Sequence, residues 1–185
     1  MPEYSRTDIN ELISKQEAEL MVAECELLRD KALLSLLWLI PARPSELMEL
    51  KRKDFRLNYE GNVKSITMKI TTKKLRKGKF QPKRNFNLIH HGSILTKSIW
   101  GYLRYLKDEE FLFPISRRMI AYIVDKAGMK SLNRHLCAYA FRHSAMTRFA
   151  NKGYGIEQLM HLKGSADIKS ISPYLHGKDQ EIDVE

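Results

Sequence analysis

Apolar residues recur at helical spacing through the first part of the chain. Ser14 followed three residues later by Glu17 is typical of a capping box, and the apolar positions after it predict a helix over residues 15–28. Residues 31–39 are apolar on nearly all sides, which predicts a helix buried in the core. We expect the next helix to begin near Pro44, because proline suits the first turn of a helix.

The pattern changes between residues 62 and 88. Apolar residues alternate with polar ones over residues 63–70, which predicts a strand. The sequence Lys-Gly-Lys at 77–79 predicts a turn, and Phe86 and Leu88 belong to a returning strand. The segment therefore forms a hairpin or small antiparallel sheet.

Helical spacing resumes over residues 94–106 and again over 116–128, with Gly128 as the expected stop. The last third of the chain reads as three short helices. Their expected breaks lie at 152–153, at 163–165 and near Gly177. The predicted fold class is mainly α with a small antiparallel β-sheet or hairpin.

The length of 185 residues predicts a single domain over 1–185, with its core over about 12–176 and a frayed acidic tail at 177–185. The longest apolar run is too short to span a bilayer, so we expect an intracellular protein of the cytoplasm or nucleoid without membrane contact. Cys25 and Cys137 lie far apart, and the six histidines form no metal-binding pattern. We therefore expect no disulfide framework and no metal.

Basic residues exceed acidic ones by 32 to 22, giving a formal charge of +10. No carboxylate occurs between Glu60 and Asp108, whereas twelve Lys and Arg fall in that stretch, nine of them between Lys64 and Arg84. A solvated loop would normally mix both signs, so this hairpin favours a polyanion such as the DNA backbone. The residues expected to contact DNA are Lys69, Arg76, Lys77, Lys79, Lys83 and Arg84.

Three separated pieces carry candidate chemistry. The first, at 42–50, places an arginine at the mouth of a helix with a carboxylate three positions on, and the second is Thr-Lys-Lys at 72–74 in the basic hairpin. The third is Tyr-Ala-Phe-Arg-His-Ser at 139–144, followed by Gly164 and, ten residues later, Tyr174. Each piece alone has an ordinary structural explanation, but their order along the chain is specific.

In this order the pieces resemble the arginine box, the β-hairpin lysine and the His-x-x-Arg, Leu-Gly-His and Tyr motifs of the tyrosine recombinase, or integrase, family. Residues 42–50 are similar to the family's pattern of Arg, Ser-Glu-Leu and a second Leu, and 141–144 match the core of its second box. The resemblance covers about residues 12–176, in an archaeal or viral-like variant. It implies the DNA breaking-rejoining catalytic fold of that family.

By this resemblance the chain is a catalytic domain of a site-specific DNA recombinase that needs no metal, ATP or other cofactor. Arg43 and Arg142 would clamp the scissile phosphate, because a guanidinium donates two parallel hydrogen bonds and keeps its charge. Tyr174 would attack the phosphate and form a 3′-phosphotyrosyl link. Lys73 would protonate the leaving 5′ oxygen, with Lys74 a near-equal candidate because the hairpin register is open.

Glu46 is expected to orient a catalytic group. The chain departs from the family at Tyr139 and Ser165, where histidine is usual for the first and histidine or tryptophan for the second, and neither replacement is a good base near neutral pH. The group that deprotonates Tyr174 is thus left open. Nearby alternatives are His143, His161 and His176. We interpret His143 as structural rather than catalytic.

The expected partners are double-stranded DNA and other recombinase protomers, four of them on DNA, with a monomer when free. The N-terminal core-binding domain usual in the family is expected to be absent. A type IB topoisomerase-like nicking-closing enzyme would use the same residues, and a DNA-binding module without activity would share the fold. An RNA-binding protein would explain the charge alone.

Overall fold

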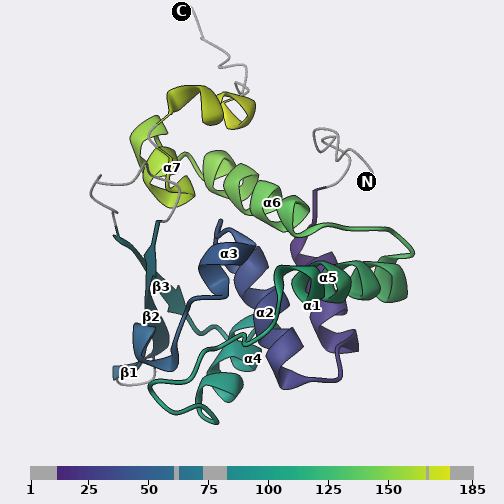
Figure 1. The fold of residues 1–185 in the computed structure, drawn as a ribbon. Helices are drawn as coiled ribbons and strands as arrows, with labels where there is room; N and C mark the ends of the chain where they lie inside the picture. The colour runs from purple at the N-terminus through teal and green to yellow at the C-terminus, as the bar shows by residue number, and fades with distance from the viewer. Residues whose placement is uncertain (1–11, 61–62, 73–82, 166, 176–185) are drawn as a thin grey trace, which may run out of the picture.

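The computed structural model describes residues 12–60, 63–72, 83–165 and 167–175, and Figure 1 shows helices gathered beside one small sheet. The α-helices are α1 (Lys15–Glu24), α2 (Leu28–Leu39), α3 (Pro44–Leu47), α4 (Ile94–Leu103), α5 (Arg117–Leu132), α6 (Ala138–Asn151) and α7 (Ile156–Lys163). The strands are β1 (Phe55–Glu60), β2 (Val63–Thr71) and β3 (Lys83–Ile89), and short 3-10 turns are η2 (Arg52–Asp54), η3 (Ile168–Ser170) and η4 (Ser172–Tyr174). The predicted fold class, mainly α with a small antiparallel sheet, is confirmed.

The first helix starts as predicted but ends earlier. The Ser14 hydroxyl accepts a hydrogen bond from the Glu17 backbone N–H (3.1 Å), and the Glu17 carboxylate accepts one from the Ser14 N–H (2.7 Å). The helix ends at Glu24 because Cys25 is extended (φ −69°, ψ 140°). Apolar spacing continues across this bend into α2, so periodicity alone could not locate it.

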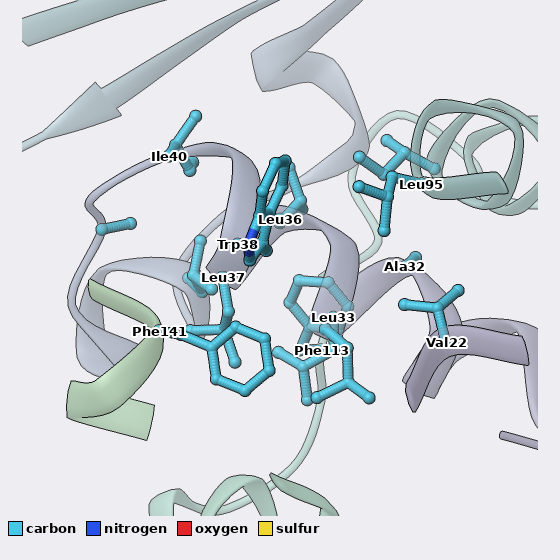
Figure 2. Packing of buried hydrophobic residues seen from close by; sticks show 14 of the residues in the cluster. Val22, Ala32, Leu33, Leu36, Leu37, Trp38, Ile40, Leu95, Phe113 and Phe141 are labelled. Carbon is cyan, nitrogen blue, oxygen red and sulfur yellow. The ribbon is translucent and has the colours of Figure 1, made fainter. Parts of the chain in front are cut away.

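Helix α2 forms the centre of the core, as its apolar character predicted. Every residue from Ala32 to Trp38 is buried, and the helix packs against α1, α4 and α6. Figure 2 shows Leu33 and Leu37 of this helix beside Phe113 and Phe141. The connection that leaves α2 leads directly to Arg43, so the core fixes the start of the candidate site.

The sheet has the antiparallel order β1-β2-β3. Met68 on the central strand pairs with Phe55 on one side and Phe86 on the other, and all three are buried. Strands β2 and β3 confirm the predicted hairpin, and its predicted turn at 77–79 lies outside the described residues. Strand β1 escaped prediction because it is an edge strand with only one fully buried residue, Phe55.

Gly128 does not end helix α5, contrary to prediction. The helix continues to Leu132, and Asn133 ends it in the left-handed conformation (φ 50°). The glycine instead permits a close approach: a Cβ at Gly128 would lie 2.6 Å from the Arg134 carbonyl oxygen. The following segment therefore folds back onto the helix at this position.

Replacing Gly128 by alanine should destabilise the fold by about 1–3 kcal/mol, because the added methyl group must displace backbone. Gly101 in α4 is the matched control, since a Cβ there meets only the Leu28 side chain at an ordinary 3.8 Å. Gly101→Ala should stabilise by roughly 0.5–1 kcal/mol through helix propensity. Urea unfolding followed by circular dichroism measures both changes, and equal shifts of the same sign would contradict this account.

The last described part of the chain contains the predicted breaks and one difference. Helices α6 and α7 end at 152–153 and 163–165, where Gly153 and Gly164 have positive φ. The third predicted helix is replaced by the 3-10 turns η3 and η4, which bring Ile171 against α6 and α7. The break predicted near Gly177 and the predicted acidic tail lie outside the described residues.

Ile171, between η3 and η4, packs in a small hydrophobic cluster with Met146 of α6 and Leu159 of α7. This cluster is separate from the main core, and Tyr174 packs against it. Among the described residues there is no helix with the length and apolar character needed to cross a membrane.

Candidate active site

Glu46 lies at the centre of the site. Its carboxylate is buried, with 3% of the residue exposed. One oxygen accepts a hydrogen bond from the Arg43 backbone N–H (2.7 Å), and the other accepts one from the Arg43 guanidinium (2.8 Å). Arg43 is thus fixed through both its backbone and its side chain at the start of α3, with 17% of its side chain exposed.

Arg84 reaches the same carboxylate from strand β3. Its Nη2 lies 2.6 Å from Glu46 Oε2, and its Nη1 donates to the Leu162 carbonyl oxygen at the end of α7 (2.7 Å). The residue is 1% exposed, and burial lowers its pKa while Glu46 opposes that shift.

This placement corrects the sequence-based expectation for Arg84. We expected a surface contact to DNA, but strand alternation places Arg84 on the buried face with Phe86. A fully buried guanidinium that is bound to a carboxylate is not free to meet a DNA backbone. Its position instead joins the base of the hairpin to α3 and α7.

Arg142 is the third arginine and comes from α6. Its guanidinium donates to the Pro41 carbonyl oxygen (2.5 Å) and the Lys163 carbonyl oxygen (2.6 Å), and its Nη1 lies 3.8 Å from Glu46 Oε2. Burial, with a contribution from Arg43, lowers the pKa of Arg142 to about 10.

Three guanidinium groups therefore face one carboxylate, a formal surplus of two positive charges within these four side chains. Such a surplus in a partly desolvated place is suited to an anion, because the charges act in a low dielectric environment. The contacts described above hold Arg43 and Arg142 in place before any anion binds.

Tyr174 is brought back to α6 by the turn η4. Its hydroxyl lies 3.0 Å from Nδ1 of His143, and the two ring centroids are 5.0 Å apart. The Lys163 ammonium lies 5.0 Å from the centre of the Tyr174 ring. Burial raises the pKa of Tyr174, whereas the charge of Arg142 lowers it, which places the hydroxyl within the electrostatic reach of the arginine site.

Tyr139 and Ser165, the two departures from the family pattern, occupy different surroundings. Tyr139 lies one turn before His143 on α6 and is 52% exposed. The Ser165 hydroxyl accepts hydrogen bonds from Ser170 Oγ (2.9 Å) and from the Asp167 N–H (3.3 Å). Ser165 thus holds the turn that leads towards Tyr174.

The basic hairpin is only partly within the described residues. Lys69 on β2 and Lys83 on β3 are exposed on the same face of the sheet. The other hairpin candidates lie outside the described residues: Lys73, Lys74, Arg76, Lys77 and Lys79. The chain leaves β2 at Thr72, whose side chain is buried against Gly164. A Cβ added at Gly164 would lie 2.9 Å from the Thr72 Oγ1. Thr72, the last described residue before Lys73, therefore lies beside Gly164 and Arg84.

From the sequence, His143 was one alternative for deprotonating Tyr174 and was interpreted as structural; the structure places its Nδ1 3.0 Å from the Tyr174 hydroxyl. The signal available in the sequence was that His143 follows Tyr139 by four residues, which places both side chains on one face of α6. For Arg84 the signal was its alternation with Phe86.

Comparisons with known proteins identify relatives of the chain. The model of the phage integrase family matches residues 10–181. Tyrosine recombinase XerC of Staphylococcus epidermidis (strain RP62A) is 26% identical over 171 residues, which covers 84% of this chain and 51% of that protein. XerC of Staphylococcus haemolyticus (strain JCSC1435) matches with the same identity and coverage. The chain spans about half the length of these curated relatives.

Solved structures share the fold. The XerH site-specific recombinase bound to difH substrate aligns with a TM-score of 0.65 and 22% identity over 88% of this chain and 48% of that one. The XerA recombinase aligns with a TM-score of 0.65 and 21% identity over 96% of this chain and 63% of that one. The Tn1549 transposon integrase in complex with transposon right end DNA aligns with a TM-score of 0.61 and 18% identity over 94% of this chain and 63% of that one. The predicted recombinase fold is confirmed.

Proposed function

Because the chain belongs to the phage integrase family of tyrosine recombinases, we propose that it cleaves and rejoins double-stranded DNA through Tyr174 as a site-specific recombinase or integrase. The observation that carries the proposal is the convergence of Arg43 and Arg142 on Glu46, with Tyr174 within the electrostatic reach of Arg142, from three segments far apart in sequence. A purely structural cluster has no need of a surplus of buried positive charge.

In the proposed reaction Arg43 and Arg142 bind the non-bridging oxygens of the scissile phosphate. Arg43 is the partly exposed member and meets the phosphate first, while Arg142 is held behind it by two carbonyl oxygens. Tyr174 attacks phosphorus, the bond to the 5′ oxygen breaks, and a 3′-phosphotyrosyl link stores the bond for rejoining to another 5′-hydroxyl. The step requires no metal, ATP or other cofactor.

We assign protonation of the leaving 5′ oxygen to Lys73, with Lys74 as the alternative. Both follow Thr72, whose buried side chain packs beside Gly164 and Arg84. Glu46 positions the arginines rather than reacting. Tyr139 and Ser165 occupy the positions of the family's usual phosphate-binding groups, and each hydroxyl is able to donate a hydrogen bond to a phosphate oxygen.

The proposed partners are a DNA duplex and further copies of the chain, four protomers on two duplexes, with free chains monomeric. Lys69, Lys83 and the remaining hairpin cations contribute phosphate contacts, so binding should weaken steeply with salt. The solved relatives that are bound to DNA support DNA as the partner class. We place the protein inside the cell, where DNA of the host or of a mobile element is its substrate.

A suicide-substrate assay tests the proposal. The protein and its Tyr174→Phe variant are incubated with nicked or 5′-bridging-thiolate duplexes of varied sequence, and a denaturant-resistant protein–DNA adduct is sought on a gel. We expect an adduct with the wild type and none with the variant, because phenylalanine lacks the attacking oxygen. An adduct that persists in Tyr174→Phe contradicts the assignment, and salt-sensitive binding with no adduct on any duplex indicates a binding module.

A further inference from the structure

We infer that His143 is a catalytic residue that accepts the proton of the Tyr174 hydroxyl during strand cleavage and returns it during rejoining. The inference rests on the proposed function. It names the base that the sequence leaves open, because Tyr139 stands where the family usually has histidine and Ser165 where it usually has histidine or tryptophan.

The contact geometry supports a direct proton transfer. His143 Nδ1 and the Tyr174 oxygen are 3.0 Å apart, within the reach needed for general base catalysis. The rings are tilted by 51° with centroids 5.0 Å apart, so the nitrogen meets the hydroxyl rather than stacking on the phenol face. Helix α6 carries both His143 and Arg142, so one element holds the proposed base and one arginine of the phosphate clamp.

The surroundings of Tyr174 make an acceptor necessary. Burial raises the pKa of its hydroxyl above the usual value, so the phenol stays protonated near neutral pH and attacks poorly without a base. Among the described residues, the charged neighbours are Arg142 on α6, which favours the phenolate, and Lys163 on α7, which lies over the ring and donates to the Ser170 carbonyl oxygen. Arg142 stabilises negative charge on Tyr174 but is not a base, because a guanidinium keeps its proton.

The other candidates are less suited. Tyr139 is half exposed and its phenol is a weak base near neutral pH. The Ser165 hydroxyl accepts from Ser170 and from the Asp167 N–H, which commits its oxygen to the turn. An imidazole, by contrast, takes up and releases protons near neutral pH.

The proton balance is simple. In the tautomer protonated on Nε2, Nδ1 takes the Tyr174 proton as the oxygen forms its bond to phosphorus, and the 5′ oxygen leaves with a proton from the proposed lysine. His143 becomes an imidazolium close to the new phosphodiester. In rejoining, the incoming 5′-hydroxyl returns its proton to that lysine as its oxygen bonds to phosphorus, the tyrosine oxygen leaves, and the imidazolium gives the proton back to the Tyr174 oxygen.

The experiment compares wild type, His143→Gln and His143→Ala on a duplex carrying a 5′-bridging thiolate at the scissile position. A thiolate leaves without protonation, so the rate of adduct formation reports activation of the nucleophile alone. We expect His143→Gln to form the adduct roughly 10²-fold more slowly or worse. The wild-type rate should fall at acidic pH as the imidazole takes up a proton, and this acidic limb should be lost in His143→Gln.

Added imidazole should partly restore the rate of His143→Ala, which a purely structural role would not produce. His135→Gln is the matched control, because that histidine lies on the surface with 79% of its side chain exposed and pairs only with Asp125 among the described contacts. It should keep the wild-type rate and pH profile. Thermal unfolding and DNA binding of all variants check the fold.

Failure of the proposed function and failure of the inference about His143 give different results. A wild type that forms no adduct, or a Tyr174→Phe variant that does, contradicts the proposed function and with it the role of His143. A normal wild-type adduct together with an unchanged rate and pH profile in His143→Gln overturns only the inference about His143. A slowed variant with the wild-type pH profile and no response to imidazole also overturns it.

Discussion

Replacing Glu46 by glutamine should lower the free energy of unfolding by about 3–5 kcal/mol, because it leaves buried guanidinium groups without their counter-charge. Glutamine has nearly the same shape, so lost packing contributes little. The remaining arginines, Arg43, Arg84 and Arg142, would then face one another across a neutral amide. Chemical denaturation at several salt concentrations measures the change, and added phosphate or sulfate should recover part of it by binding between the arginines.

Glu109→Gln is the matched control. Its carboxylate also pairs with two cations, Lys51 and Lys53, at 3.0 and 2.8 Å, but 70% of its side chain is exposed. Solvent screens such a pair, so stability should hardly change. If Glu46→Gln behaved like Glu109→Gln, the idea that Glu46 neutralises a buried arginine cluster would be wrong.

Replacing Arg84 by methionine is expected to have the second largest effect, a loss of about 3 kcal/mol. Methionine fills a similar volume, but it removes the donor to the Leu162 carbonyl oxygen and the partner of Glu46. Arg84→Lys should not restore stability, because one ammonium on a flexible stem does not reproduce a guanidinium that spans both acceptors. Thermal unfolding provides the measurement.

The same variant tests the link between the hairpin and the site. Without Arg84, the base of the hairpin loses its bonds to Glu46 of α3 and to the Leu162 carbonyl of α7, so adduct formation should slow even at temperatures where the fold is intact. Arg56→Met on the edge strand β1 is the control, because Arg56 is exposed. Combining Arg84→Met with Glu46→Gln should cost less than the sum of the single changes, since both remove one interaction.

Prediction from sequence succeeded where a pattern reflects burial on one face. The buried helix α2 and the paired strands β2 and β3 follow directly from apolar runs and alternation. It failed where the determining contact is tertiary. The bend at Cys25 keeps the helical spacing of its neighbours, and Gly128 is required by the carbonyl of Arg134 rather than by a helix end.

The site shows the same division. Arg43, Glu46 and Arg142 lie together as the motifs implied. Arg84 was misplaced because a basic run reads as a surface, while the alternation within the run puts one of its members inside. The return of the chain through η4, which brings Tyr174 to His143, leaves no periodic signal in the sequence.

The small cluster of Met146, Leu159 and Ile171 has a consequence for how the molecule opens. These residues support Tyr174 but do not join the main core. The segment after α6 is held to the main core by the packing of Leu162 and by the bonds that Arg84 and Arg142 donate to the carbonyl oxygens of Leu162 and Lys163. Cooperative units with little buried apolar contact detach at free energies well below that of global unfolding. Local opening of the segment that carries the proposed nucleophile would therefore also remove two acceptors from the arginine cluster.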